Sequence, residues 1–551
     1  MKTAYRRAAA AMLLLAAACA ALVCAMAPSF VEDAVRRQIA ELPAALPEYP
    51  GVTVEPPQVG EVRFSPFSRE LVLRGIECRG NARGTAASAP VTFSIRAEEL
   101  SFRLTLRAVL LTTPLGRFLL PGADAEPVLL PVAGSAHIRD LTQTVTMPDI
   151  VLTSTLRAGE AEDIRADTRL LRALLTDMAG RSDASPAGPD AIDMAYGLAV
   201  ERLRLDQMTL EMTTAGGKPC GSAACAEGLI LNKEGRRVAE QTFSGIRATL
   251  PDGQKLALAS LKYLAVVLPE KERLRAFLRE LNGAPLSANR LQAALEGLVS
   301  GPEPLVGELV VTDMAVSVDQ ANSLEGAHAL RLKRCGSVWR SSAPLDQEFL
   351  VEGLSLPVFP LEEATGLRFP GLSAFVFDAT AAVRGAGPQG SAAASPERHT
   401  GTIIVRGLGT LDYAFTLASG GHAAPETLLR GTYSDLSFRY ADAGLFAYLA
   451  NGFMPSPEAA MMVIKVGLAR FCSADTPENA ALRGALETFV ERPGTLSLVG
   501  RLPFTLLEAL MMAGDGNAGA LFSATAEPGP RTLGESMRHI QTLGASQNTG
   551  R

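Results

Sequence analysis

The chain has 551 residues, of which 47% are hydrophobic and 20% charged, so it can bury a core and is not disordered by composition. Its net charge of −6 and its pI near 5.7 argue against a nucleic-acid binder, because phosphate contacts require a concentrated basic face. Aromatic residues make up only 5% of the chain, which disfavours base-stacking and sugar-stacking sites.

The start of the chain predicts that most of the protein lies outside the cytoplasm. Basic residues precede an uncharged apolar stretch, residues 8–27, which is long enough to cross the hydrocarbon core as a helix. We therefore expect residues 1–28 to form a single-pass anchor in the bacterial inner membrane, with the N-terminus cytoplasmic and the bulk periplasmic. The alternative is a cleaved leader, because Ala25-Met26-Ala27 satisfies the small-x-small rule for a cleavage site.

A short juxtamembrane helix is expected next, over residues 29–47. Ser29 and Glu32 have the spacing of a capping box, and Pro43 and Pro47 end the amphipathic run that follows. The period then changes to two in VRFSPFSRELVLRGIECRG, residues 62–80. This alternation predicts a strand, a proline-containing turn and a second strand.

This opening resembles that of AsmA-like envelope proteins, in which a strand with a Pro-Phe turn leads into an L-x-L-x-x-[LI] strand. The residues that carry the resemblance are Phe64, Pro66, Phe67, Leu71, Leu73 and Ile76. The resemblance covers mainly the first hundred residues. It implies an inner-membrane-anchored periplasmic protein with a role in outer-membrane biogenesis or phospholipid movement, and it carries over no catalytic residue.

A loose signature recurs along the chain: a small or acidic residue, then Leu, Ile or Met, then alternating strand residues. It appears as RGIEC at 74–78, EELSF at 98–102, PDIVL at 148–152, DQMTL at 206–210, SGIRA at 244–248, TDMAV at 312–316, EGLSL at 352–356, RGLGT at 406–410 and SDLSF at 434–438. Its irregular spacing excludes a solenoid of fixed period and favours a large, mostly antiparallel, curved sheet with one apolar face. The residues expected to line that face and to hold acyl chains are Leu100, Phe102, Leu104, Leu106, Met314, Val316 and Val318.

Helical patterns interrupt the strands at 160–178, 270–281 and 288–299, and the C-terminal portion is more helical. There we expect helices at 442–449, 457–472, 477–490 and 504–512, with a strand at 495–498. The predicted fold class is therefore α+β and β-rich: an N-terminal transmembrane helix, a large curved sheet with inserted helices, and a more helical C-terminal region. The expected segments are 48–181 (first β-rich), 192–384 (second β-rich, with a helical insert at 269–299), 398–525 (C-terminal α/β) and 526–551 (disordered tail).

Five cysteines lie beyond the apolar stretch, and two of them are close together in KPCGSAAC. Cys220 and Cys225 are expected to form a disulfide at a hairpin tip; free thiols and a metal site are the alternatives. The chain contains only five histidines, and none lies beside this loop in sequence, so a metal site is disfavoured.

Chemistry-bearing motifs are absent from the sequence: there is no phosphate-cradling loop, no HExxH helix, no GxSxG elbow and no SxxK nucleophile. We therefore expect no enzyme, no cofactor and no metal. The expected function is non-catalytic envelope biogenesis or lipid handling. The expected partners are the inner membrane, through residues 8–27, and phospholipid or an envelope protein. The alternative is an anchored structural or interaction protein with a closed core and no lipid ligand.

Overall fold

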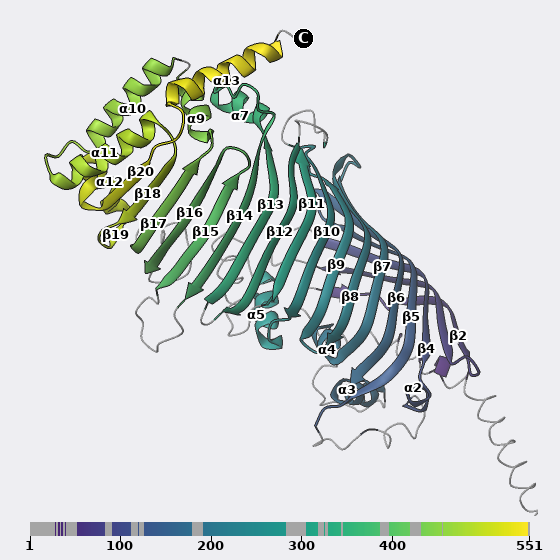
Figure 1. Ribbon diagram of the computed structural model, residues 1–551. Coiled ribbons are helices and arrows are strands. Elements are labelled where there is room, and N and C mark those ends of the chain that lie inside the picture. Colours follow the sequence, from purple (N-terminus) through teal and green to yellow (C-terminus); the bar gives the residue numbers. More distant parts are fainter. Residues whose placement is uncertain are drawn as a thin grey trace, which may run out of the picture. The chain divides into compact units, whose positions relative to one another are not determined.

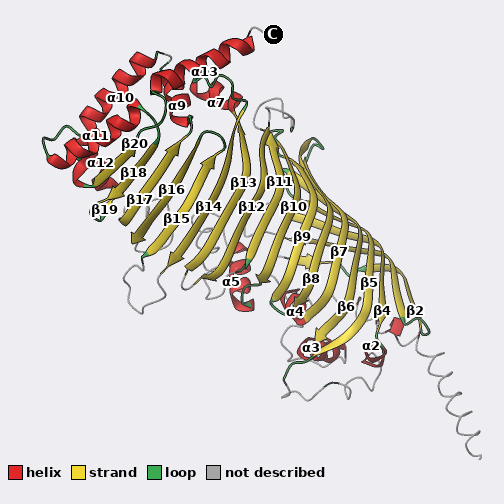
Figure 2. Ribbon diagram, viewed as in Figure 1, coloured by secondary structure: helices red, strands yellow, loops and turns green. Residues whose placement is uncertain are grey.

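The computed structural model describes residues 52–82, 91–111, 126–178, 191–282, 305–317, 329–342, 345–385, 396–418, 431–454 and 456–548, together with a few positions between 28 and 39 and single residues at 120 and 324. Within these residues 20 strands join in one large sheet, and neighbouring strands pair antiparallel along it (Figures 1 and 2). The chain divides into two compact units: residues 1–253 with 262–300, and residues 254–261 with 301–551.

Unit 1 holds long strands joined mostly to their neighbours in sequence. Its strands are β1 Val52–Val54, β2 Gln58–Ser65, β3 Glu70–Ala82, β4 Val91–Leu104, β5 Leu129–Thr146, β6 Ile150–Asp167, β7 Leu198–Thr214, β8 Pro219–Glu234, β9 Arg237–Thr249 and part of β10 Lys255–Val267. Its helices are α2 Leu106–Leu111, α3 Thr168–Met178, α4 Ala191–Gly197 and α5 Lys271–Asn282. Because α2 and α3 follow alternate strands, they lie at the same strand end, where α4 also lies (Figure 1).

Unit 2 continues the antiparallel pattern and adds helices toward the C-terminus. Its strands are β11 Glu308–Ser317, β12 Ala329–Ser342, β13 Leu345–Pro357, β14 Ala374–Gly385, β15 Glu397–Val405, β16 Gly409–Ala418, β17 Thr432–Asp442, β18 Thr495–Gly500, β19 Phe504–Thr505 and β20 Phe522–Glu527. Its helices are α7 Val358–Thr365, α9 Leu445–Phe453, α10 Pro457–Phe471, α11 Pro477–Glu491, α12 Leu506–Gly514, the short 3-10 helix η3 Ala518–Ala520, and α13 Leu533–Asn548.

Local capping chemistry starts the C-terminal helices where the sequence predicts them. The side chains of Ser456 and Thr476 accept hydrogen bonds from backbone N–H groups in the first turns of α10 and α11, and each helix has proline near its start. Thr505 and Glu508 form a reciprocal capping box at α12. The core of this part of unit 2 packs α9, α10, α11 and α13 against β14, β15 and β17.

The recurring signature marks a backbone feature in the strands. At seven of its nine occurrences, the residue before the Leu, Ile or Met has a positive φ between 48° and 72°; these residues are Gly75, Gln207, Gly245, Asp313, Gly353, Gly407 and Asp435. Glycine adopts this left-handed region without cost, and Asp enters it more readily than bulky residues do. The signature is therefore a site of local strand distortion rather than a ligand motif.

In unit 1 three of these residues fall on one line across the sheet together with Asp140, which also has a positive φ. Gly75, Asp140, Gln207 and Gly245 lie on alternate strands β3, β5, β7 and β9, with φ of 63°, 49°, 53° and 64°. The register places each opposite a residue of the strand between, and the regular Cα pairing is interrupted at every one of these positions. Such bulge-like residues increase twist and re-aim the side chains that follow. We call these four residues the left-handed line.

The expected fold class is wrong in its N-terminal transmembrane helix, because no helix within the described residues is both long and apolar enough to cross a membrane. The expected large antiparallel sheet is present, and strands hold 56% and helices 26% of the structure. β6 and β7 pair side by side across residues 182–191, and β14 and β15 do so across 385–397. Residues 8–27, where that helix was expected, lie outside the described residues.

Three element predictions also need comment. Residues 160–167 belong to β6, and only Thr168–Met178 is helical. The expected disordered tail instead contains the end of β20 and α13, in which Leu533 and Met537 are fully buried and Ile540 is nearly so. The helix expected at 288–299 lies outside the described residues. By contrast, the strand–turn–strand at 62–74 is confirmed. The helices expected at 270–281, 457–472 and 477–490 are also confirmed, and their observed ends lie within one residue of the expected ones.

Candidate functional site

One face of the unit 1 sheet carries a continuous apolar row that runs across seven strands, β3 to β9. Directly paired residues share a face, and the register joins them in the order Leu73, Leu100, Ile138, Gly159, Leu205, Gly228 and Phe243. We call this the apolar face. The two glycines make room for their neighbours, since a Cβ on Gly159 would lie 2.7 Å from Ile138 and one on Gly228 would lie 2.9 Å from Met208.

The left-handed residues shift the alternation of side chains on their own strands, as Gly75 of β3 shows. Leu73 and Ile76 are three residues apart, so simple alternation would place them on opposite faces. The left-handed Gly75 between them shifts the alternation, and both side chains pack into the same hydrophobic cluster. A second apolar row therefore follows beyond the line, through Leu141, Leu156 and Met208.

The described helices of unit 1 cap one strand end. Leu111 of α2, Leu130 of β5 and Leu170 of α3 are buried together there. Asp193 of α4 pairs with Lys271 at 2.9 Å and with Arg275 at 2.8 Å, which joins α4 to α5. Across the middle of β5 to β9 most apolar-face side chains are only half-buried, and Leu210 on this face is 43% exposed. The middle of the apolar face therefore lies open among the described residues.

The row predicted from β4 has a different environment. Leu100, Phe102 and Leu104 share one face, as expected, and pack in the cluster that also holds Val31 and Val35. Phe64 N–H donates a 2.8 Å hydrogen bond to Glu32 Oε1, so Glu32 fixes this helical stretch to β2. These three predicted lipid-facing residues are therefore covered by the chain itself.

The other predicted lipid-facing residues divide between the two units. Leu106 begins α2 and is 61% exposed, so it does not belong to the β4 row. Met314 and Val316 lie on β11 of unit 2, where they pair with Leu332 and Leu330. Val318 lies outside the described residues.

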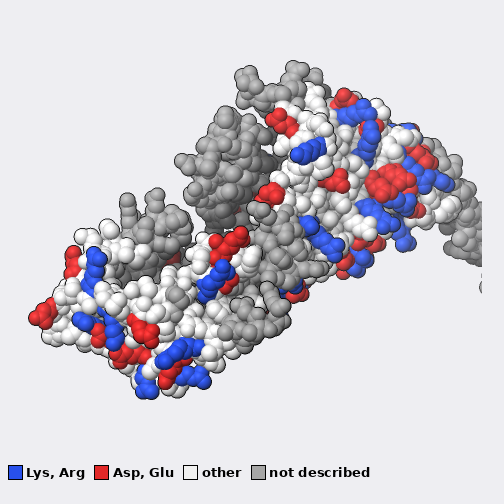
Figure 3. All heavy atoms as spheres, turned by 90° about the horizontal axis from the view of Figure 1, so that it is seen from above, with Lys and Arg blue, Asp and Glu red and all other residues white. Residues whose placement is uncertain are grey.

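The opposite face of the unit 1 sheet is charged. Arg74 pairs with Glu61 at 3.3 Å and with Glu99 at 2.9 Å, and Arg139 reaches Glu99 at 3.9 Å. Hydrogen bonding to Glu99 raises the pKa of Arg74. On the face of the molecule shown in Figure 3, basic and acidic side chains are likewise interspersed. These exposed, mutually neutralising pairs indicate a solvated face rather than a binding site.

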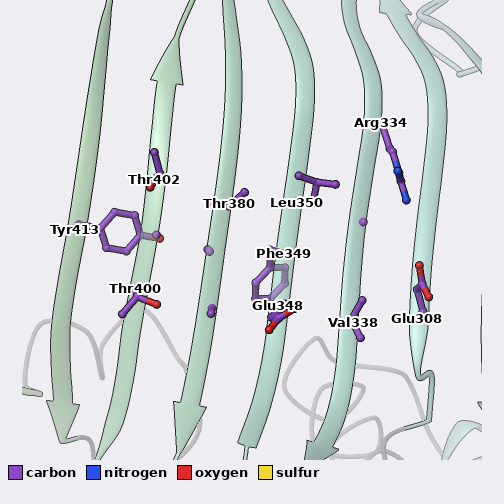
Figure 4. Close-up of a pocket in the computed structure, with 14 residues that line it drawn as sticks. Glu308, Arg334, Val338, Glu348, Phe349, Leu350, Thr380, Thr400, Thr402 and Tyr413 are labelled. Carbon is purple, nitrogen blue, oxygen red and sulfur yellow. The ribbon is translucent and has the colours of Figure 1, made fainter. Parts of the chain in front are cut away.

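The sheet of unit 2 contains a hollow of about 580 Å³ over β11 to β16 (Figure 4). Its lining mixes apolar Phe349 and Leu350, hydroxyls such as Thr402, and the opposed charges Arg334 and Glu348. This mixture selects no single ligand chemistry.

The predicted disulfide is corrected by strand geometry. Cys220 and Cys225 are both free and lie within β8, not at a hairpin tip. Five residues of extended strand span roughly 16 Å, whereas a disulfide needs Cα atoms within about 7 Å. Cys225 Sγ instead lies 3.3 Å from the Glu227 carbonyl and 3.4 Å from the Ser244 carbonyl. Among the described residues, no cluster of three or more His, Cys, Asp or Glu side chains could hold a metal ion.

Comparison with known proteins adds no functional assignment. No protein-family model and no curated protein matches the sequence. Among solved structures, a mutant porin from Rh. blastica is similar over 68% of this chain and 86% of its own length, with 10% sequence identity and a TM-score of 0.13. Similarity at this TM-score carries no argument about fold or function.

Proposed function

We propose that this protein handles lipid in the bacterial envelope without catalysis, holding acyl chains against the apolar face of unit 1. The single observation that carries the proposal is the apolar row across β3 to β9: its β3–β4 end packs against Val31 and Val35, while its middle, on β5 to β9, is half-exposed among the described residues. Burying apolar surface is favourable by roughly 25 cal/mol per Å², so an open apolar face of this kind has a strong tendency to bind hydrocarbon.

The division of charge between the faces supports the same proposal. The ion pairs around Arg74 and Glu99 lie on the opposite face, so an acyl chain on the apolar face does not contact these charged side chains. The AsmA-like opening of the sequence points in the same direction, because the resemblance implies envelope biogenesis or phospholipid movement.

A charge introduced on each face tests the proposal. Leu210 is 43% exposed on the apolar face, and Glu211, the next residue, is exposed on the other face. We expect Leu210→Glu protein to fold but to lose phospholipid that copurifies with the wild type in native mass spectrometry. The matched variant Glu211→Lys should keep that lipid. Wild-type protein without lipid, or equal lipid in both variants, would refute the proposal.

A second candidate function rests on the segment that packs over β4. Because Val31 and Val35 pack against the row of Leu100 and Phe102, part of the apolar surface is ordinary core. If the whole face is closed in this way, the protein has a structural or interaction role. Leu210→Glu then leaves a buried unpaired charge and unfolds unit 1, which thermal unfolding distinguishes from simple loss of lipid.

A further inference from the structure

An apolar cavity of about 550 Å³ lies at one end of the unit 2 sheet, beneath α7 and α9. All eleven described residues that line it are apolar, and they come from β12, β13, β14, the segment before β14, and the two helices. The space is open to solvent on one side, so it is an apolar pocket at the surface of unit 2 rather than an enclosed void. Its volume falls in the range of roughly 300–1,000 Å³ that is typical of ligand pockets.

The floor of the cavity is fixed and its mouth is open. Phe369 and Phe375 are 2% and 6% exposed, and their rings meet edge to face at 5.2 Å. Both belong to the main hydrophobic core of unit 2. At the mouth, Leu361 of α7 and Leu449 of α9 are 41% and 39% exposed. A ligand can therefore enter without opening the core.

The lining also defines the chemistry of the ligand. It includes no charged or polar side chain that could orient a head group. A polar molecule would lose its hydrogen bonds to water in this space and gain none, whereas a hydrocarbon chain would lose nothing. The lining offers water no hydrogen bonds either, so covering this apolar surface with a hydrocarbon chain is favourable.

The predicted row on β11 leads to this cavity. Val316 pairs with Leu330, and Leu330 lines the cavity together with Leu356. On β13 and β14, Leu356 pairs with Phe375, which also lines it. The cavity therefore lies on the apolar side of the unit 2 strands, where a chain bound in it contacts the sheet on one side and α7 and α9 on the other.

We propose that this cavity binds a single hydrocarbon chain, with the polar end of the ligand left outside its mouth. The site goes beyond the proposed function, because it lies in unit 2 and is separate from the apolar face of unit 1. The chain comes either from a free fatty acid or from a phospholipid, and the test includes one arm for each.

The probes are palmitate with a photoreactive diazirine near its chain end and phosphatidylethanolamine carrying the same chain. Ala364 lines the cavity and is exposed on α7, so Ala364→Trp should fill the space without disturbing the core. The neighbouring exposed Glu363, which is not among the lining residues, gives the matched control Glu363→Trp. Thermal unfolding of both variants verifies that unit 2 is folded.

We expect labelled peptides from residues 357–377 and 445–449 in the wild type and in Glu363→Trp, and loss of that label in Ala364→Trp. Labelling by palmitate alone identifies a fatty-acid site, and labelling by both probes identifies a site for phospholipid chains as well. Label confined to β5–β9 would overturn this inference while supporting the proposed function. Label confined to the cavity would support this inference and overturn the proposed function. Label that persists in folded Ala364→Trp would also overturn the inference.

Discussion

Gly245 tests whether the left-handed line across unit 1 is a required feature of the sheet. Gly245 has φ +64°, and a Cβ added there would lie 2.8 Å from the Cβ of Ala226 on the adjacent strand. An L-residue in this conformation costs roughly 1–2 kcal/mol. Relieving the overlap with Ala226 costs about 1–2 kcal/mol more, because backbone in mid-sheet has little freedom to move. Gly245→Ala should therefore lower the free energy of unfolding by about 2–4 kcal/mol.

Gly235 provides the matched control, since it has φ +54° in the turn between β8 and β9 and an added Cβ would meet nothing within 4 Å. Gly235→Ala should lower the free energy of unfolding only by the cost of the left-handed backbone conformation, roughly 1–2 kcal/mol. Gln207→Gly should be close to neutral, because relief of its strain offsets the roughly 0.5–1 kcal/mol that glycine loses in chain entropy. Urea unfolding of the three variants measures these differences. A cost at Gly245 no greater than at Gly235 would show that the line is not tightly packed.

Three further predictions concern unit 2. Met537→Ala should lower the free energy of unfolding by roughly 2–4 kcal/mol, because this side chain is fully buried; an unchanged urea midpoint would mean that α13 is not docked. Gly401→Ala should lower the melting temperature, since its Cβ would lie 2.4 Å from a backbone carbonyl oxygen, and an unchanged value would contradict that geometry. Asp378 accepts hydrogen bonds from Arg406 at 2.6 and 2.7 Å and from Gly353 N–H at 2.8 Å, and Arg406 lowers the pKa of Asp378. Its contribution to stability is therefore present above the carboxyl's unfolded pKa and lost as pH falls through the lower folded pKa. Wild-type and Asp378→Asn stabilities should differ near neutral pH and converge in acid, whereas a difference independent of pH would exclude this role for the charge.

The sequence predicts those elements whose signals are local. The helices α10 and α11 begin where Ser456 and Thr476 cap a turn containing proline, and both signals lie within four residues of the helix start. The β2–β3 pair is similarly defined by alternation around the turn that contains Pro66. These elements can be predicted from the sequence without knowing which distant residues they pack against.

The sequence fails where distant pairing decides the conformation. Residues 160–167 have apolar spacing that suits a helix, but β6 pairs along its length with β5 and β7, and this pairing holds them extended. In the tail, polar composition concealed the spacing of Leu533, Met537 and Ile540, which places one buried stripe on α13.

The candidate site could be predicted only in part. Alternation correctly placed Leu100, Phe102 and Leu104 on one face. It could not show that Val31, Val35 and Ile39 pack against them while Leu210 stays exposed, because these three residues belong to a separate segment. The cavity beneath α7 and α9 cannot be predicted for the same reason, although the apolar run with two prolines from Leu356 to Leu361 is a visible signal of an unusual apolar segment.

The most direct test of the central proposal places a photoreactive benzoylphenylalanine at Leu210 in cells and asks what it contacts. An adduct with the mass of a phospholipid at Leu210, and none with the same residue placed at Glu211 on the opposite face, is the predicted result. A probe at Leu210 that forms only protein cross-links, or that captures no more lipid than the probe at Glu211, would contradict the proposal that the apolar face holds acyl chains.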